Sequence, residues 1–165
     1  MISLILLVYK LFNLWLHLNE NSGSTSFSDD AQSDNGPHNA TCSGSACPLA
    51  NGSFAGFDGT NDLLTVADDD EFNLSNFTAS LWVNLRTIKA QTFWAKGTTG
   101  LNIGTNAQGY VTVSDYLSNC TTLVSLLSGT ALTTGSWQNI VVTYNSSTLA
   151  LYLNGVKAVE TSAAS

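Results

Sequence analysis

Charged side chains are scarce in this chain, and their scarcity excludes one class of partner. Only 10% of the 165 residues are charged, and the net charge is -7 with five Lys and Arg in total. Because binding to nucleic acid requires cations that neutralise phosphates, so few basic residues argue against DNA or RNA. Asn, Ser and Thr instead supply a third of the chain. These residues suit the outer faces of sheets better than the surfaces of helices, which predicts an all-β fold.

Groups that carry out catalysis are also few. The two histidines, His17 and His38, both precede residue 53, where the β pattern begins, so that segment has no imidazole base for a Ser-His or Cys-His site. No predicted strand carries two acidic residues at i and i+2 or i+4, as the carboxylate pair of a glycosidase would require. Phosphate-binding Gly-Lys loops and zinc-ligand spacings do not occur. We therefore predict that the protein is not an enzyme.

The three cysteines form an odd set. Cys42 and Cys47 enclose four residues of a Gly/Ser segment, which could close into a small disulfide loop in an oxidising compartment. The alternative is two free thiols. Cys120 would then be either a buried thiol or the partner of a cysteine that this chain lacks.

Residues 1–20 are apolar but interrupted, and their pattern predicts an amphipathic helix. Lys10, Asn13, His17 and Glu20 recur at spacings of three or four, with leucines on the opposite side. Three interpretations stay open: a signal or membrane anchor, an upstream extension included by mistake, and a helix that lies at a membrane interface. A secretory signal would begin with basic residues, which are missing here, and Lys10 interrupts a membrane span.

Residues 21–52 are rich in Ser, Gly, Asp and Asn and poor in large apolar residues, which predicts a flexible linker. Residues 53–165 would then form one folded domain. The clearest β pattern in it begins at Gln138, where apolar residues alternate with polar ones as far as Leu153 around a polar loop at 145–148. Asn154-Gly155 supplies the pair for a type I′ turn, and a third strand begins at Val156.

Shorter strands, separated by glycines, precede this three-stranded meander. Alternation is strong at 77–85, where Ala79, Leu81 and Val83 fall on one face and Trp82 on the other. The other predicted strands are 63–66, 92–96, 101–103, 110–114 and 122–127. Strands at such regular spacing indicate an antiparallel two-sheet β-sandwich or jelly roll.

Four fragments of this segment resemble the laminin G-like, concanavalin A-like jelly-roll family. They are FDGTNDLLTV at 57–66, FTASLWVNL at 77–85, AKG at 95–97, and GSWQNIVVTYNSSTLALYLNGVKA at 135–158. The resemblance spans about 54–159 and implies a non-catalytic, extracytoplasmic module, secreted or on the cell surface, that binds carbohydrate or an extracellular protein; the alternative is a structural or adhesion module. Family members continue with further strands after the Asn-Gly hairpin, so the resemblance also implies a C-terminally truncated fragment. A further alternative is a fragment of a larger surface protein or glycosidase.

The resemblance and the residue types together suggest two kinds of site. Asp58 and Asp62 flank a tight turn and offer the hard oxygen ligands that Ca²⁺ prefers, and a plain Asx-type turn is the alternative. Carbohydrate binding would use aromatic residues that stack on sugar faces, and packing between strands is the alternative for each. The candidates are Trp82, Trp94, Tyr110 and Tyr152. Trp137, at the start of its strand, is assigned no ligand role.

Overall fold

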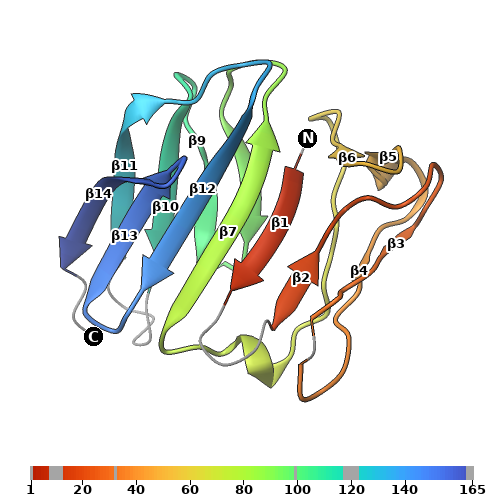
Figure 1. Ribbon diagram of the computed structural model, residues 1–165, viewed down its shortest axis with the longest axis horizontal. Coiled ribbons are helices and arrows are strands. Elements are labelled where there is room, and N and C mark those ends of the chain that lie inside the picture. Colours follow the sequence, from red (N-terminus) through yellow and green to blue (C-terminus); the bar gives the residue numbers. More distant parts are fainter. Residues whose placement is uncertain (1, 8–12, 32, 99, 117–122, 163–165) are drawn as a thin grey trace. The chain divides into compact units, whose positions relative to one another are not determined.

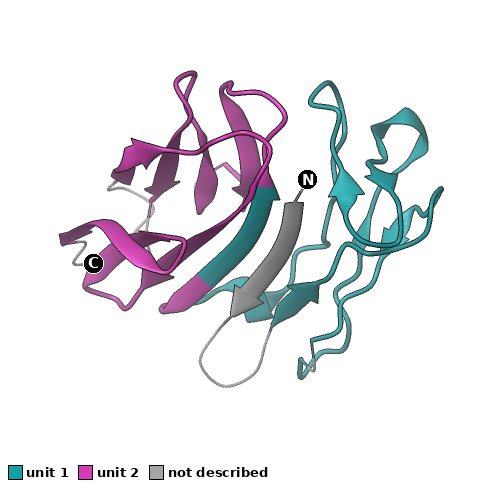
Figure 2. Cartoon of the chain, turned by 45° about the horizontal axis from the view of Figure 1, so that its top comes forward, with its two compact units in different colours: residues 1–74, 79–83 teal, residues 75–78, 84–165 magenta. Residues whose placement is uncertain are grey.

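A computed structural model describes residues 2–7, 13–31, 33–98, 100–116 and 123–162, with residues 2–7 as backbone only. The chain divides into two compact units (Figure 2). Unit 1 comprises residues 1–74 and 79–83, and unit 2 comprises residues 75–78 and 84–165. Strand β7 (Phe77–Asn84) contributes to both. Nearly all regular structure is antiparallel β, which confirms the predicted fold class.

Unit 2 contains the predicted meander, formed by β12 (Trp137–Tyr144), β13 (Thr148–Leu153) and β14 (Val156–Ser162), side by side in Figure 1. Ile140 pairs with Leu153 and Val142 with Leu151. The side chains of Ile140, Val142 and Leu151 are fully buried, because a period of two places alternate residues on the core face.

Both loops of the meander have the expected turn chemistry. Between β12 and β13, Oδ1 of Asn145 accepts hydrogen bonds from the N–H groups of Ser147 and Thr148. Between β13 and β14, Asn154 and Gly155 both have positive φ, of 51° and 79°, as a type I′ turn requires.

A second sheet of unit 2 has the strand order β11-β10-β9-β8. Its strands are β8 (Gln91–Ala95), β9 (Asn102–Thr105), β10 (Tyr110–Asp115) and β11 (Val124–Ala131). Ile103, Val111 and Val113 are buried on its inner face. Because β11 contacts β13 and β14 of the meander, the two sheets of unit 2 face each other as a sandwich.

Unit 1 corrects the prediction of an N-terminal helix. Residues Ile2–Leu7 form β1 and Leu14–Leu16 form β2, and Leu4 pairs with Leu16. Leu14, Leu16 and Leu18 are buried, whereas Trp15 and His17 between them are partly exposed, which is a period of two. The rings of Trp15 and His17 lie 4.7 Å apart on the same side of the chain, as neighbours at i and i+2 do in a strand.

The predicted linker also has structure of its own in unit 1. It contains β3 (Ser26–Phe27), β4 (Ala40–Thr41), the 3₁₀ turn η1 (Gly44–Ala46) and β5 (Leu49–Ala50). Phe27 pairs with Ala40, and both are fully buried. β5 pairs with β6 (Ala55–Gly56), and Ala55 pairs with Ile2 of β1. A small apolar core thus holds a segment whose composition suggested flexibility.

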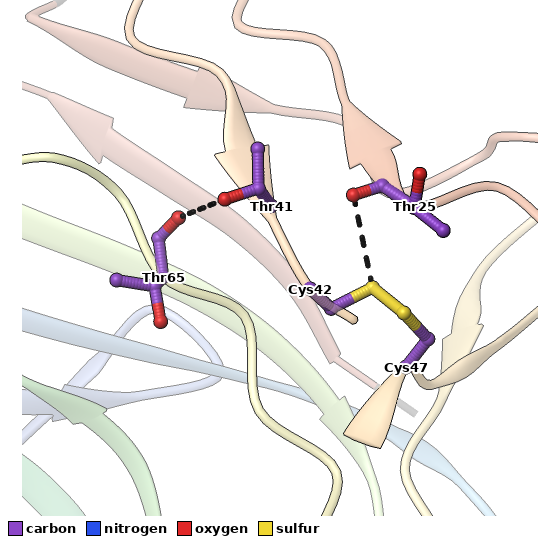
Figure 3. The surroundings of a disulfide bond; sticks show 5 residues. All are labelled: Thr25, Thr41, Cys42, Cys47 and Thr65. Atoms are coloured by element: carbon purple, nitrogen blue, oxygen red, sulfur yellow. Dashed lines mark hydrogen bonds between the residues drawn. A yellow bond between two sulfur atoms is a disulfide. The ribbon is translucent and has the colours of Figure 1, made fainter. Parts of the chain in front are cut away.

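The disulfide between Cys42 and Cys47 is confirmed, with the two Cα atoms 5.1 Å apart (Figure 3). The N–H of Cys42 donates to the carbonyl oxygen of Thr25 at 3.0 Å, which continues the pairing of β3 with β4. On the other side, Thr41 exchanges backbone hydrogen bonds with Thr65. The predicted strand at 63–66 is therefore not formed as such. In its place the structure has a single β-bridge between Thr41 and Thr65. Cys120 lies outside the described residues.

Candidate functional site

Trp82 is the most exposed of the predicted aromatic candidates. It lies on β7 between Leu81 and Val83, which are fully buried, so strand alternation directs the indole away from the core. Its exposed fraction is 41%. Trp137 at the start of β12 is equally exposed, so exposure alone does not distinguish a ligand-binding tryptophan.

Tyr152 lies on the outer face of the meander and is partly exposed. It pairs with Val141 of β12 on one side and with Lys157 of β14 on the other. Lys157 forms an ion pair with Glu160, with Nζ and Oε1 3.0 Å apart. The phenol ring therefore has a charged pair in the neighbouring strand of the same sheet.

Trp94 and Tyr110 lie in the second sheet of unit 2 and on opposite faces of it. Trp94 pairs with Ile103, which is fully buried, so the indole belongs to the inner face and is only partly exposed. Tyr110 alternates with the buried Val111 and lies on the outer face. The structure therefore does not bring these two aromatic residues together in one patch.

The turn that follows β6 in unit 1 holds the predicted calcium ligands. Oδ2 of Asp62 accepts a hydrogen bond from the N–H of Asp58 at 2.6 Å, and Oδ1 of Asp58 accepts one from the N–H of Thr60 at 2.7 Å. Gly59 has a φ of 76°. Both carboxylates therefore cap their own turn, an Asx-type arrangement, and calcium binding there stays a prediction.

A third group in unit 1, which the sequence did not indicate, combines His38, Asp69 and Glu71. Nε2 of His38 lies 3.0 Å from Oε2 of Glu71, and their side chains are only 9% and 15% exposed. One ligand atom from each of the three residues lies within 4.8 Å of the others. In the described part of the chain this is the one group of three His, Cys, Asp or Glu residues that is close enough to share a metal ion.

Hydrogen bonds hold both carboxylates of this group in their ionised form. The pKa of Glu71 lies below its ordinary value, mainly because of the hydrogen bond with His38, with a further contribution from the N–H of Asn35. The pKa of Asp69 is lowered chiefly by the N–H of Glu71 and then by the side chain of Asn35. Desolvation opposes the shift in both residues without reversing it.

Comparison with known proteins settles the family. Residues 58–165 match the family model of the Concanavalin A-like lectin/glucanases superfamily. The chain belongs to this superfamily. The resemblance inferred from the four sequence fragments is thereby confirmed.

One solved structure is similar to this concanavalin A-like chain. It is the crystal structure of an S-layer domain-containing protein (residues 221–444) from Clostridium thermocellum, with 28% sequence identity and a TM-score of 0.52. The similarity covers 90% of this chain and 71% of that one. A comparison with curated proteins gave no match.

At the level of the superfamily, membership supports a module that binds carbohydrate or another ligand, or that acts in adhesion. The family and the disulfide together indicate an extracellular protein. None of the helices in the described residues has the length and apolar character needed to cross a bilayer.

Proposed function

We propose that the protein is a non-catalytic, extracellular module that binds carbohydrate. Trp82 is the observation that carries the proposal: a large aromatic ring is exposed on a strand whose opposite face holds the fully buried Ala79, Leu81 and Val83. The strand fixes the backbone of Trp82 and the indole has only two rotatable χ angles, so that limited conformational entropy is lost when a ligand stacks on it. Membership in a superfamily of lectins and glucanases makes a sugar the favoured ligand.

Tyr152 offers a second stacking surface on the outer face of the meander. Ala150 lies two residues before Tyr152 on β13. It pairs with Thr143 of β12 on one side and with Glu160 of β14 on the other. Together with Lys157, these residues supply the hydroxyl, carboxylate and ammonium groups that hydrogen-bond sugar hydroxyls. An aromatic ring beside such polar groups is the usual composition of a site that holds a polar ligand with apolar faces.

Absence of catalysis is part of the proposal. The carboxylates of Asp58, Asp62 and Asp69 each accept backbone hydrogen bonds from their own turns. Carboxylates used in this way stabilise loops and are not poised as an acid and base on either side of a glycosidic bond.

A structural or adhesion module is the second candidate, and one comparison favours it. The similar solved structure comes from an S-layer domain-containing protein.

A glycan array with matched variants separates the two candidates. We expect the chain to bind a subset of glycans and Trp82→Ala to weaken that binding at least tenfold. The control is Trp137→Ala, which removes an equally exposed tryptophan and should leave binding unchanged. Thermal melts of both variants show whether each is folded. Absence of any bound glycan, or equal loss in both variants with unchanged melts, would favour the adhesion module.

A further inference from the structure

We propose that His38, Asp69 and Glu71 form a binding site for a divalent transition-metal ion, with Zn²⁺ as the expected occupant. This inference goes beyond the carbohydrate proposal and does not depend on it. It starts from one imidazole nitrogen and two carboxylate oxygens that lie within 4.8 Å of one another and come from two segments of unit 1.

The two carboxylates are placed by a single short turn. η2 spans Asp70–Phe72, and Asp69 is its N-cap, with Oδ1 accepting the N–H of Glu71 at 2.9 Å. This bond fixes the spacing of the two side chains. The side-chain amide of Asn13 donates to the carbonyl oxygen of Glu71 at 2.6 Å and anchors the turn to the segment before β2.

The backbone of His38 is held outside that turn, by Asp29, whereas its ring packs against a residue of the turn, Phe72. The backbone N–H of His38 donates to Oδ2 of the buried Asp29 at 2.8 Å, and the centroid of its ring lies 4.8 Å from that of Phe72. The backbone and the ring are therefore both held before any ligand binds. Preorganisation of this kind lowers the entropy lost on binding.

Asn35 supplies the outer layer of support. Its N–H donates to Oε1 of Glu71 and its side-chain amide donates to Oδ1 of Asp69, both at 2.8 Å. Because Oε1 of Glu71 is engaged by Asn35, Oε2 is the oxygen that faces His38. In protein metal sites, neighbouring residues typically donate hydrogen bonds to the metal-binding side chains and so orient them.

The donor set favours zinc over calcium. Ca²⁺ takes six to eight oxygen ligands, whereas an imidazole nitrogen with two carboxylates suits Zn²⁺ and its neighbours in the first transition row. Three protein ligands would leave a fourth position for water. Ligand bonds of about 2.0–2.2 Å place tetrahedral ligand atoms roughly 3.3 Å apart. The 3.0 Å separation of His38 and Glu71 is near that value, and the ligand atom of Asp69, within 4.8 Å of both, would have to approach them more closely.

The competing interpretation is a hydrogen-bonded pair of His38 and Glu71 with no affinity for metals. The chain contains its own control for this, because its other histidine, His17, also faces a carboxylate. Nε2 of His17 lies 3.3 Å from Oδ2 of Asp30, with side chains 40% and 57% exposed. A general tendency of His–carboxylate pairs to collect zinc would appear at both histidines.

The test is a titration of the chelator-treated full chain with Zn²⁺, followed by calorimetry and by NMR of the imidazole nitrogens. We expect one ion per chain and a shift of the His38 resonances with those of His17 unchanged. His38→Gln and Glu71→Gln should each weaken binding at least tenfold, and His17→Gln should not. Ca²⁺ should leave both histidine signals unchanged.

Two results would overturn the proposal. One is no heat and no imidazole shift at micromolar to low-millimolar Zn²⁺. The other is a shift of both histidines together, or equal loss in His17→Gln and His38→Gln, which would mean adventitious surface binding. The NMR measurement uses the unaltered chain, so it decides the matter even if a variant fails to fold. Glycan binding is measured separately, so failure of one proposal leaves the other in place.

Discussion

The backbone N–H of His38 donates a hydrogen bond to Oδ2 of Asp29 at 2.8 Å. Oδ1 of the same carboxylate accepts the N–H groups of Trp15 and Ala31, at 2.7 Å and 2.9 Å. A single buried side chain therefore connects β2, the residues after β3 and the residues before β4.

Replacing Asp29 should therefore destabilise unit 1. Asp29→Asn turns an amide donor toward at least one backbone N–H, and an unsatisfied buried group costs about 1–3 kcal/mol. We expect a loss of that size in urea or thermal unfolding. Asp30→Asn is the control, because Asp30 is exposed and should change stability by at most about 0.5 kcal/mol. Equal stability of the Asp29→Asn variant would mean that this network contributes nothing.

The disulfide should stabilise unit 1 by a modest amount. Cys42 and Cys47 are five residues apart, and closing so short a loop removes entropy worth about 2 kcal/mol from the unfolded chain. The double variant Cys42→Ser/Cys47→Ser should show this loss and should no longer respond to reductant. A parent protein whose unfolding is the same with and without reductant would contradict the prediction.

Gly104 should not tolerate a side chain. A Cβ at this position of β9 would lie 2.3 Å from the carbonyl oxygen of Gln91, a backbone atom of the paired strand β8. Gly104→Ala must therefore push the two strands apart, at a cost of about 1–3 kcal/mol. Gly129→Ala in β11 is the matched control, because its Cβ would meet nothing within 4 Å. Unfolding curves that rank the two variants the other way would be inconsistent with this register.

Acidification should weaken the metal-free protein through Glu71 and Asp69. Both have a pKa that is lower in the folded chain than the ordinary values of 4.5 and 3.8. The unfolded chain therefore takes up protons first, so the stabilisation is present above these ordinary values and is lost as the pH falls through the folded ones.

Melts from pH 7 to 3 in the presence of a chelator measure this effect. Glu71→Gln should flatten the curve in the acid range, whereas Glu160→Gln, on an exposed strand of unit 2, should not. A variant curve parallel to that of the parent throughout the range would show that Glu71 titrates normally.

The sequence predicted the meander because the information for it is local. Ile140, Val142 and Leu151 alternate with polar residues, and Asn154-Gly155 specifies its own turn. The same holds for β7, where Leu81 and Val83 are buried and Trp82 is exposed. The disulfide was one of two open alternatives, and the bond between Cys42 and Cys47 in the structure decides between them.

The N-terminal strands β1 and β2 depend on contacts between residues that are distant in sequence. The local pattern of residues 1–20 therefore predicted a helix, which was wrong. Leu14, Leu16 and Leu18 alternate over too few residues to outweigh the helical spacing of the polar positions. What fixes β2 as a strand is its pairing with β1 and the bond from Trp15 to Asp29. Phe27 and Ala40 similarly bury each other within a composition that is otherwise typical of a linker.

The group of His38, Asp69 and Glu71 gave no readable signal. His38 and Glu71 are separated by 33 residues, and Asp69-Asp70-Glu71 alone reads as a solvated acidic turn. No metal motif is readable in the sequence because the two segments meet through contacts made in the fold, namely those of Asn35 and His38 with Asp69, Glu71 and Phe72. Spacing rules find ligands on one element and not those that folding brings together from two.

Strand β14 comes last in its sheet among the described residues, so one row of its backbone groups has no hydrogen-bonded partner strand there. Such a border invites edge-to-edge association with another molecule. The irregularity between Leu151 and Tyr152 distorts the pairing of β13 with β14, and Lys157 and Glu160 place opposite charges along the same strand. A strand from another molecule would have to match an irregular edge and desolvate two charged side chains. Both requirements oppose the addition of further strands at β14, as in a fibril.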